Sequence, residues 1–455
     1  MMSETNYSQN PSYVSEHVAQ WLAHLVPDPE DRVLQITAGT PDPNLWDLPW
    51  DTPIEDWPQD LIVALPRGIS RHVVRFVRAG DRLLAVKEIG REVAKHEYEL
   101  LRDLDRLNAP SVQAVAVVTG RIDKNGEPLA ACLITEHLPY SLPYRAVFGS
   151  HHRMDTVRKL VDALSVLLVR LHLLGFYWGD VSLSNTLFRR DAGMFAAYLV
   201  DAETGELTAT LGDGKREYDV DNARINIIGE LMDLRAGDIL PDEIDVIGVG
   251  DLLVQRYHAL WNELTAETAI ESNAKWKIAE RIRRLNDLGF EVGEMNMRQD
   301  VDGTHIMIQP KVVDAGHYTH QVMRLTGMEV QENQARRMVN DMKQFQVASG
   351  MENMPDSVVA HAWLTRVFEP TVSAVPRNLA GKLEGPEIFH QVLDHRWFIS
   401  EQAGRDIPMG EAVQSYIKNV LPMRRDEVAI VDTPTQEIPV ISTPDAGAAQ
   451  SGQAQ

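Results

Sequence analysis

The chain has 455 residues, 44% of them hydrophobic, and a formal net charge of −22 at pH 7. This length is enough for two or three domains, and the acidic balance argues against nucleic-acid binding through a broad basic face. No apolar run reaches the roughly 18 residues that a membrane span needs, and the polar first residues lack a signal-peptide core. The sequence therefore predicts a cytoplasmic protein without a membrane span. Its one cysteine, Cys132, lies in an apolar run, which is typical of a buried thiol.

The first 140 residues are predicted to contain an irregular lead-in, then strands and one helix. Residues 1–55 include a piece rich in proline and tryptophan, and we expect them to be mostly irregular. Three runs rich in Val, Ile and Leu within 61–89 predict strands, because turn-forming residues separate them. Leucines at helical spacing predict a helix over 91–107. Two further strands, within 112–122 and 129–138, flank an Asn-Gly pair that is typical of a hairpin turn.

The rest of the chain is predicted to be mainly helical. A long amphipathic helix is expected over about 153–174, because apolar residues recur on one face. A polar loop follows, and then two short strands bracket a charged turn at 189–195. After about residue 218 we expect helices, interrupted within 288–313 by a β-hairpin with an Asp-Gly turn. Residues 431–455 are small, polar and proline-bearing, so we expect a disordered tail.

Lys87 lies inside an otherwise apolar strand, where a charged residue needs an explanation. It is either an edge residue whose amine reaches water, or a cleft residue that binds phosphate and needs an acidic partner. The following helix offers two glutamates. Glu97 falls within the apolar stripe, four residues after Val93, whereas Glu99 lies on the polar side. A carboxylate on a buried face requires a cation, so the pattern selects Glu97 as the partner of Lys87.

The loop after the long helix, GFYWGDVSLSN, presents two polar residues between apolar elements. Asp180 precedes Asn185 by five positions, a spacing that often occurs by chance. Asp201 then ends the next apolar run. Each of these residues has an ordinary interpretation as a turn former. Together they also offer carboxylate and amide oxygens, the ligands that Mg²⁺ prefers, and a carboxylate that can orient a hydroxyl.

Phosphoryl transfer needs this set of residue types. A lysine neutralises phosphate, a glutamate fixes the lysine, one carboxylate orients the attacking hydroxyl, and a second carboxylate with an amide oxygen holds magnesium. The sequence supplies Lys87, Glu97, Asp180, Asn185 and Asp201 in turn. We therefore predict Lys87, Glu97 and Asp180 as catalytic residues of an ATP-dependent phosphotransferase with an unknown hydroxyl acceptor.

Residues from about 60 to 235 resemble the protein-kinase-like fold in an atypical bacterial form. AVK resembles the strand that carries the kinase lysine, and GDVSLSNTLF resembles the catalytic loop of the RIO-type and lipopolysaccharide-kinase-like branches. LVDAE stands where kinases carry the metal-binding Asp-Phe-Gly. The whole chain also resembles an actinobacterial family described only as lipopolysaccharide-kinase-like, whose second half contains segments like LTGMEVQENQARRMVNDM and IFHQVLDHRWFISE.

The resemblance implies an α+β fold, with a bilobal kinase-like domain followed by a mostly α-helical domain that carries a β-hairpin. The predicted division is an irregular segment at 1–55, a kinase-like domain at 56–235, a helical domain at 236–430 and a disordered tail at 431–455. Within the kinase-like domain, the two lobes are expected to meet near residue 140.

The resemblance also implies ATP bound between the lobes. Asn185 and Asp201 would hold Mg²⁺ or Mn²⁺ there. Gly68 is the remnant of a glycine-rich phosphate loop, and the backbone from Glu136 to Leu138 would face adenine. The second domain would supply the acceptor site or bind a protein partner.

The sequence departs from the usual kinase pattern at several positions. Trp178 replaces the histidine that usually stands two residues before the catalytic aspartate, and Ser182 replaces the lysine that usually follows it. Ala202 and Glu203 replace the Phe and Gly after the metal-binding aspartate, and Gly68 is the single glycine of the phosphate loop. A pseudokinase that binds nucleotide as a scaffold or regulatory protein is therefore the alternative prediction. An adaptor that binds no nucleotide is the third.

Other candidate sites are weaker. Arg67, Arg71 and His72 offer phosphate contacts in place of the missing glycine amides, although surface residues of this kind more often have no such role. The histidines of the second half lack cysteine or acidic partners at zinc-binding spacing, so packing explains them better.

Overall fold

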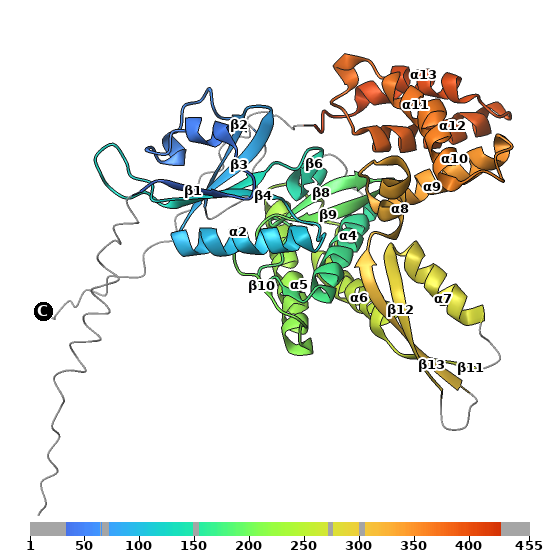
Figure 1. Cartoon of the computed structure of the whole chain (residues 1–455), viewed down its shortest axis with the longest axis horizontal. Helices are drawn as coiled ribbons and strands as arrows, with labels where there is room; N and C mark the ends of the chain where they lie inside the picture. The colour runs from blue at the N-terminus through green and yellow to red at the C-terminus, as the bar shows by residue number, and fades with distance from the viewer. Residues whose placement is uncertain are drawn as a thin grey trace, which may run out of the picture.

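The computed structural model describes residues 33–63, 65, 72–148, 154–271, 276–299 and 305–428. Three parts follow one another along the chain: a small lobe to residue 140, a large lobe from 141 to 265, and a C-terminal region from 266 onward (Figure 1). The predicted tail, 431–455, lies outside the described residues. No helix among the described ranges is long and apolar enough to cross a membrane.

The small lobe is a five-stranded antiparallel sheet with one helix against it. Strand order is β1-β4-β5-β3-β2, and the bounds are β1 Gln35–Ala38, β2 Val73–Ala79, β3 Arg82–Ile89, β4 Ala114–Thr119 and β5 Ala131–Glu136. Helix α2, Arg91–Arg106, packs against β4 and β5. Its buried face includes Leu100, Leu101 and Leu104, as the helical spacing predicts. Cys132 of β5 is buried, as expected, and burial raises its thiol pKa to about 12.

The small lobe adds detail to two predictions. Within the mostly irregular lead-in, the short strand β1 pairs with β4 along the edge of the sheet, and Trp50 is buried in the core of this lobe. In the predicted strand LIVAL, the described residues 61–63 and 65 form an isolated bridge, Ile62 to Val77 of β2, in place of a regular strand. Val63 N also donates to Phe76 O at 2.8 Å.

The large lobe is built from helices and short strand pairs. Its helices are α3 Tyr144–Phe148, α4 Met154–Leu173, α5 Asp213–Ala236 and α6 Val246–Thr265. Its strands are β6 Ser141–Pro143, β7 Phe176–Tyr177, β8 Thr186–Asp191, β9 Met194–Leu199 and β10 Glu206–Leu207. Helix α4 packs against β9 and α6. The predicted long helix and the predicted strand pair around the charged turn are therefore both present.

The main hydrophobic core crosses the predicted boundary at residue 235. Leu253 and Tyr257 of α6 belong to the same buried cluster as Leu164 and Leu168 of α4, and Phe290, the first residue of strand β12 (Phe290–Gln299), joins it. Helix α6 therefore covers the large lobe rather than starting a separate core.

The C-terminal region begins with a small sheet and continues as helices, which confirms the predicted α+β fold class. The sheet order is β11-β13-β12, and the predicted hairpin is the pair β12 and β13, whose Asp-Gly turn lies outside the described residues. A third strand, β11, was not expected. The bounds are β11 Thr268–Glu271, α7 Trp276–Asp287, β12 Phe290–Gln299, β13 His305–Ala315, α8 His317–Thr326, α9 Glu332–Ala348, α10 Asp356–Trp363, α11 Glu369–Ser373, α12 Gly385–Ala403 and α13 Met409–Asn419.

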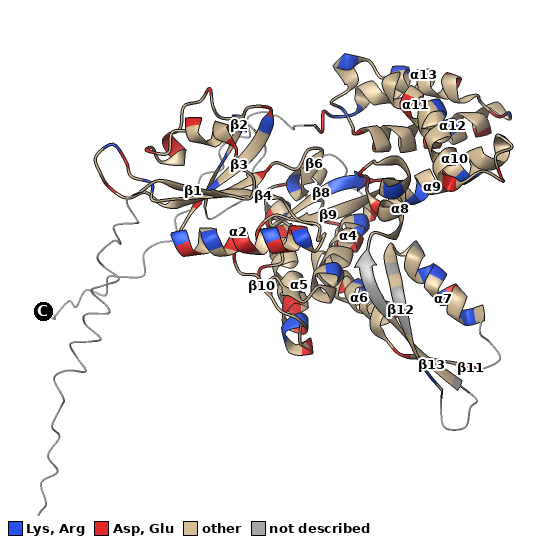
Figure 2. Ribbon diagram, viewed as in Figure 1, with Lys and Arg blue, Asp and Glu red and all other residues tan. Residues whose placement is uncertain are grey.

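The β8–β9 hairpin holds the C-terminal region through a buried set of contacts that we call the docking network. Asp191, at the end of β8, accepts hydrogen bonds from Asn333 N, Asn333 Nδ2 and Gln334 N, at 3.2, 2.8 and 2.8 Å. These donors are at the start of α9, so Asp191 caps a helix of another region. Arg190 forms a bidentate ion pair with Glu427 at 2.8–2.9 Å. Arg189 pairs with Glu384, and Figure 2 shows this basic stretch of β8 beside α9.

Candidate active site between the two lobes

Lys87 is the centre of a charged cluster where the two lobes meet, which we call the cleft network. Its Nζ lies 3.0 Å from Glu97 Oε2, 2.8 Å from Asp201 Oδ2 and 3.4 Å from Glu203 Oε2. The strand β3 lies between β2 and β5, so Lys87 is not an edge residue. Its side chain is only 12% exposed. The predicted pairing with Glu97 is therefore present, and Glu99 remains exposed on the other face of α2.

The environment of this ion pair shifts the pKa values of both Glu97 and Lys87. Burial, followed by the negative charge of Asp201, raises the pKa of Glu97 to about 7, and Lys87 opposes this rise. Burial lowers the pKa of Lys87, but Glu97 and Asp201 outweigh it, so that the lysine pKa is raised. Lys87 is thus a fixed positive charge among three carboxylates. A further positive charge would relieve the repulsion between those carboxylates.

The segment after β9 is fixed by hydrogen bonds to both lobes. Ala202 N donates to Glu97 Oε1 at 3.2 Å, and Glu203 N donates to Asp201 Oδ1 at 3.0 Å. The fully buried Trp178 donates from its indole Nε1 to Asp201 O at 2.8 Å. The tryptophan that replaces the usual kinase histidine therefore holds the backbone of the predicted metal ligand.

Asp180 and Asn185 face each other across their loop. Asn185 Nδ2 donates to Asp180 O at 3.0 Å and to Asp180 Oδ2 at 3.2 Å. Asn226 Nδ2, from α5, reaches the other carboxylate oxygen of Asp180 at 3.3 Å. Because the amide nitrogen of Asn185 is turned toward Asp180, its amide oxygen is the end left to face a cation.

Helix α5 presents a polar stripe that holds this loop, formed by Asp219, Asn222, Asn226 and Glu230. The buried Asp219 accepts from Trp178 N and Gly179 N, both at 2.7 Å. Glu230 accepts from Leu183 N at 2.7 Å and from Ser184 N at 2.8 Å. Asn226 Nδ2 also donates to Val181 O at 3.0 Å, and Asn222 Nδ2 donates to Gly179 O at 3.5 Å. The loop that carries Asp180 is therefore fixed through its backbone by one helix.

The two predicted metal ligands lie close together at the open end of the β8–β9 hairpin. Val200 N donates to Asn185 O at 3.0 Å, and Asp201 is the next residue. Among the described residues, the acidic oxygens of Glu97, Asp201 and Glu203 also lie within 4.8 Å of one another. This set of carboxylate and amide oxygens fits Mg²⁺ or Mn²⁺ by ligand type.

The predicted adenine-facing segment follows directly on β5. His137 N donates to Leu83 O at 2.9 Å, and the Glu136 carboxylate pairs with Arg82 at 2.8 Å. The Glu136 side chain is therefore engaged at the surface, and Leu138 offers the backbone that remains to face a ligand. Gly68 lies outside the described residues, as do Arg67 and Arg71. His72 is described, and its Nε2 lies 3.0 Å from Glu203 Oε2 in the cleft network.

Several residues of this site were not predicted as contributors. Glu203 appears in the sequence only as a departure from the kinase pattern, yet its carboxylate contacts both Lys87 and His72. The α5 stripe was also missed. Its signal is present, because Asp219, Asn226 and Glu230 recur at helical spacing beside the apolar positions of the same helix.

Comparisons with known proteins divide the chain into two matched segments. Residues 79–224 match the lipopolysaccharide kinase (Kdo/WaaP) family, and residues 259–421 match a domain of unknown function, DUF4032. Among solved structures, one match is described as WaaP in complex with acyl carrier protein. It is 16% identical, covers 56% of this chain and 99% of that chain, and has a TM-score of 0.34. Among curated proteins, none matches.

Proposed function

Because the chain carries a lipopolysaccharide-kinase-like domain followed by a DUF4032 domain, we propose that it is an ATP- and Mg²⁺-dependent phosphotransferase with a hydroxyl acceptor. One observation carries the proposal. Lys87 bridges Glu97 of α2 and Asp201 of the large lobe at 3.0 and 2.8 Å, while the Asp180–Asn185 loop is held on the same side by α5. Val200 N donates to Asn185 O at 3.0 Å, which connects this loop to the neighbouring Asp201. These contacts support the proposal that the five residues act together in phosphoryl transfer.

In the proposed reaction, the acceptor hydroxyl oxygen attacks the γ-phosphorus of ATP, and the bond to the β–γ bridging oxygen breaks to release ADP. Asp180 orients the hydroxyl and accepts its proton, and the Asn185 and Asn226 amides hold the carboxylate in place for this role. Lys87 neutralises the phosphates that are not transferred, and Glu97 keeps its amine directed into the cleft.

The proposed metal site consists of Asn185 and Asp201, with Glu203 available beside them. A divalent cation bound there supplies positive charge to the phosphate oxygens. The chain's own contribution is to fix these ligands: the Trp178 indole holds the Asp201 backbone, and Val200 N ties Asn185 to the end of β9.

The test is slow ATP consumption by purified wild type and Asp180→Asn, measured side by side with Mg²⁺. The substitution keeps size and hydrogen bonding but removes the charge, so we expect turnover to fall at least about tenfold, the low end for loss of a general base. ATP binding, read as the rise in melting temperature with MgATP, should remain near normal. Asp221→Asn, on the exposed face of α5, is the matched control. Equal turnover in wild type and Asp180→Asn would contradict the assignment.

A nucleotide-binding pseudokinase is the second candidate, and Glu203 favours it. This carboxylate lies 3.4 Å from Lys87 and 3.0 Å from His72, at the position where kinases have a glycine. It adds a negative charge close to Lys87, the group that would bind the phosphates of the nucleotide. The pseudokinase predicts a MgATP-dependent rise in melting temperature with no turnover in either protein across a panel of hydroxyl acceptors.

A further inference from the structure

The three N–H donors of the Lys87 ammonium group are matched by three carboxylates of the cleft network. Its Nζ lies 3.0, 2.8 and 3.4 Å from oxygens of Glu97, Asp201 and Glu203. A lysine side chain has three donors and no acceptor. A phosphate oxygen that binds Lys87 must therefore take a donor from one of these carboxylates.

Two of the three carboxylates are also held by backbone amides. Glu97 Oε1 accepts from Ala202 N at 3.2 Å, and the Glu97 side chain is only 1% exposed. Asp201 Oδ1 accepts from Glu203 N at 3.0 Å. Moving either carboxylate away from Lys87 would disturb a backbone hydrogen bond as well as an ion pair, and both losses cost free energy.

Glu203 is the carboxylate that Lys87 holds least tightly. Its contact with Lys87 is the longest of the three, and among the described residues its carboxylate otherwise contacts only His72, at 3.0 Å. The Glu203 side chain is 23% exposed, so that it can turn toward solvent without leaving a buried, unpaired charge. Glu203 is therefore the carboxylate that an incoming phosphate displaces.

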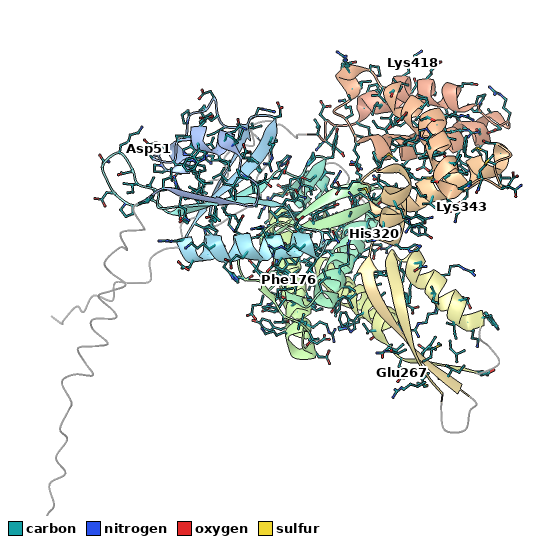
Figure 3. All side chains as sticks on the ribbon, viewed as in Figure 1. Asp51, Phe176, Glu267, His320, Lys343 and Lys418 are labelled. Carbon is teal, nitrogen blue, oxygen red and sulfur yellow. The ribbon has the colours of Figure 1, made fainter. Side chains whose placement is uncertain are left out.

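The backbone beside Glu203 is fixed, which limits this displacement to the side chain. Thr204 Oγ1 donates to Trp178 O at 2.8 Å. A Cβ placed on Gly205 would lie 2.5 Å from the ring of Phe176, which is labelled in Figure 3, so the chain passes close against the large lobe at this point. A rotation of the Glu203 side chain is then enough to free one donor of Lys87.

We propose that Glu203 is an internal competitor of the nucleotide, whose carboxylate occupies the place at Lys87 that a phosphate group of ATP takes on binding. The inference rests on the proposed function, because it concerns the same nucleotide cleft. Binding of ATP turns Glu203 away from both Lys87 and His72, while Glu97 and Asp201 keep their positions. The affinity for ATP is therefore lower than the cleft would otherwise provide.

The competitor acts only on ligands that carry phosphate. A nucleoside brings no anionic group to Lys87 and leaves the contact with Glu203 in place. A nucleotide gains the lysine but must break that contact, and its negative charge also repels the displaced carboxylate. Removal of the Glu203 charge should therefore strengthen the binding of ATP and leave the binding of adenosine unchanged.

The test is calorimetric titration of ATP with Mg²⁺, and separately of adenosine, into the full chain. Glu203→Gln and Glu203→Ala should each bind ATP at least about fivefold more tightly than wild type, the scale of one partly exposed ion pair. Their affinity for adenosine should stay within about twofold of wild type. Glu203→Asp keeps the charge but shortens the side chain, and its ATP affinity should lie between those of wild type and Glu203→Gln.

Glu206→Gln is the matched control. This glutamate lies three residues further along the chain, is 54% exposed and pairs with Lys215 rather than Lys87, so its loss should leave ATP affinity unchanged. Melting temperatures without nucleotide show whether each variant retains the fold.

The possible outcomes are distinct. ATP affinity that is unchanged in Glu203→Gln and Glu203→Ala overturns the proposal, and a lower ATP affinity overturns it in favour of a metal ligand at Glu203. An equal gain for adenosine also overturns it, because the effect then does not depend on phosphate. Failure of the proposed function looks different, since in that case neither wild type nor any variant binds ATP.

Discussion

The cleft network and the docking network occupy opposite ends of the same β8–β9 hairpin, yet their charges are arranged differently. In the docking network Arg190 meets Glu427, Arg189 meets Glu384, and Asp191 meets the start of a helix. In the cleft network one lysine meets three carboxylates, and two of these remain about a quarter exposed. Paired, buried charges hold two regions together, whereas an excess of one sign at an open position invites a ligand of the other sign.

The contrast separates two kinds of mutational effect. Changes in the docking network should lower the free energy of unfolding and leave nucleotide binding intact. Changes in the cleft network should weaken nucleotide binding and leave the free energy of unfolding nearly unchanged. Five measurements test this distinction, beginning with the largest expected effect.

Lys87→Met should remove the stabilisation by MgATP altogether. At a nucleotide concentration of 100 Kd that stabilisation is about 2.7 kcal/mol in the wild type. The apo variant should remain folded, because Glu97, with a pKa raised to about 7, can take up a proton when its partner is lost. The measurement is melting temperature with and without MgATP, and Lys159→Met on α4 is the control. An unchanged MgATP shift in Lys87→Met would contradict the assignment of the lysine.

Asp191→Ala should lower the free energy of unfolding by about 1–3 kcal/mol, because three donors at the start of α9 lose their acceptor. The rise in melting temperature that MgATP causes should persist in this variant. Chemical denaturation measures the first quantity, and Asp406→Ala, which removes a largely exposed ion pair with Arg396, serves as the control. Loss of the MgATP shift in Asp191→Ala would show that the two networks are not separable.

Asp201→Asn should blunt the dependence of nucleotide binding on Mg²⁺. Removing one anionic oxygen beside a divalent cation should raise the Mg²⁺ concentration required by about tenfold, or about 1.4 kcal/mol. Titrating Mg²⁺ at constant ATP measures this, with Asp233→Asn on the exposed side of α5 as the control. If the Mg²⁺ titrations of Asp201→Asn and wild type have the same midpoint, Asp201 is not a metal ligand.

The docking network should also depend on pH through Asp191. Burial raises its carboxyl pKa from 3.8 to about 6, so folding takes up a proton and the contribution of this group to stability falls as pH rises. Between pH 5 and 7 the stability of the wild type, relative to Asp191→Asn, should fall by about 1 kcal/mol. Denaturation of both proteins across that range measures the difference. If the stability of the wild type relative to Asp191→Asn stays constant or increases from pH 5 to 7, the raised pKa of Asp191 is contradicted.

Glu136→Gln should have the smallest effect. Its carboxylate pairs with Arg82 while both side chains are 38% exposed, and exposed pairs contribute little. If the backbone of this segment faces adenine, ATP affinity should stay within about twofold of wild type. A tenfold loss of ATP affinity in a MgATP titration would instead show that the Glu136 carboxylate has a direct role in nucleotide binding.

The parts of the site that the sequence predicts are those that local periodicity reveals. Lys87 stands out in an apolar strand, and Glu97 stands out on the apolar face of the next helix, so their pairing follows from the pattern alone. Asp180, Asn185 and Asp201 need the resemblance to kinases as well, because their spacing is common by chance.

The parts that escape prediction depend on distant partners. Strand β1 has four residues and gains its place only by pairing with β4, about 80 residues later. Asp191 has no local signal, because its partner Gln334 lies 143 positions away. The polar stripe of α5 has a periodic pattern in the sequence, but the loop that it binds lies some 40 residues earlier in the chain.

The stripe of α5 also makes that helix intolerant of changes in length. Asp219, Asn226 and Glu230 must all point to the same side to reach successive backbone groups of one loop. An α-helix turns by about 100° per residue. Inserting or deleting a single residue between Asp219 and Asn226 would rotate one part of the stripe away from the loop while leaving composition and helix propensity almost unchanged. In homologous chains, insertions should therefore fall before residue 219 or after residue 230, and the eleven steps between them should be constant.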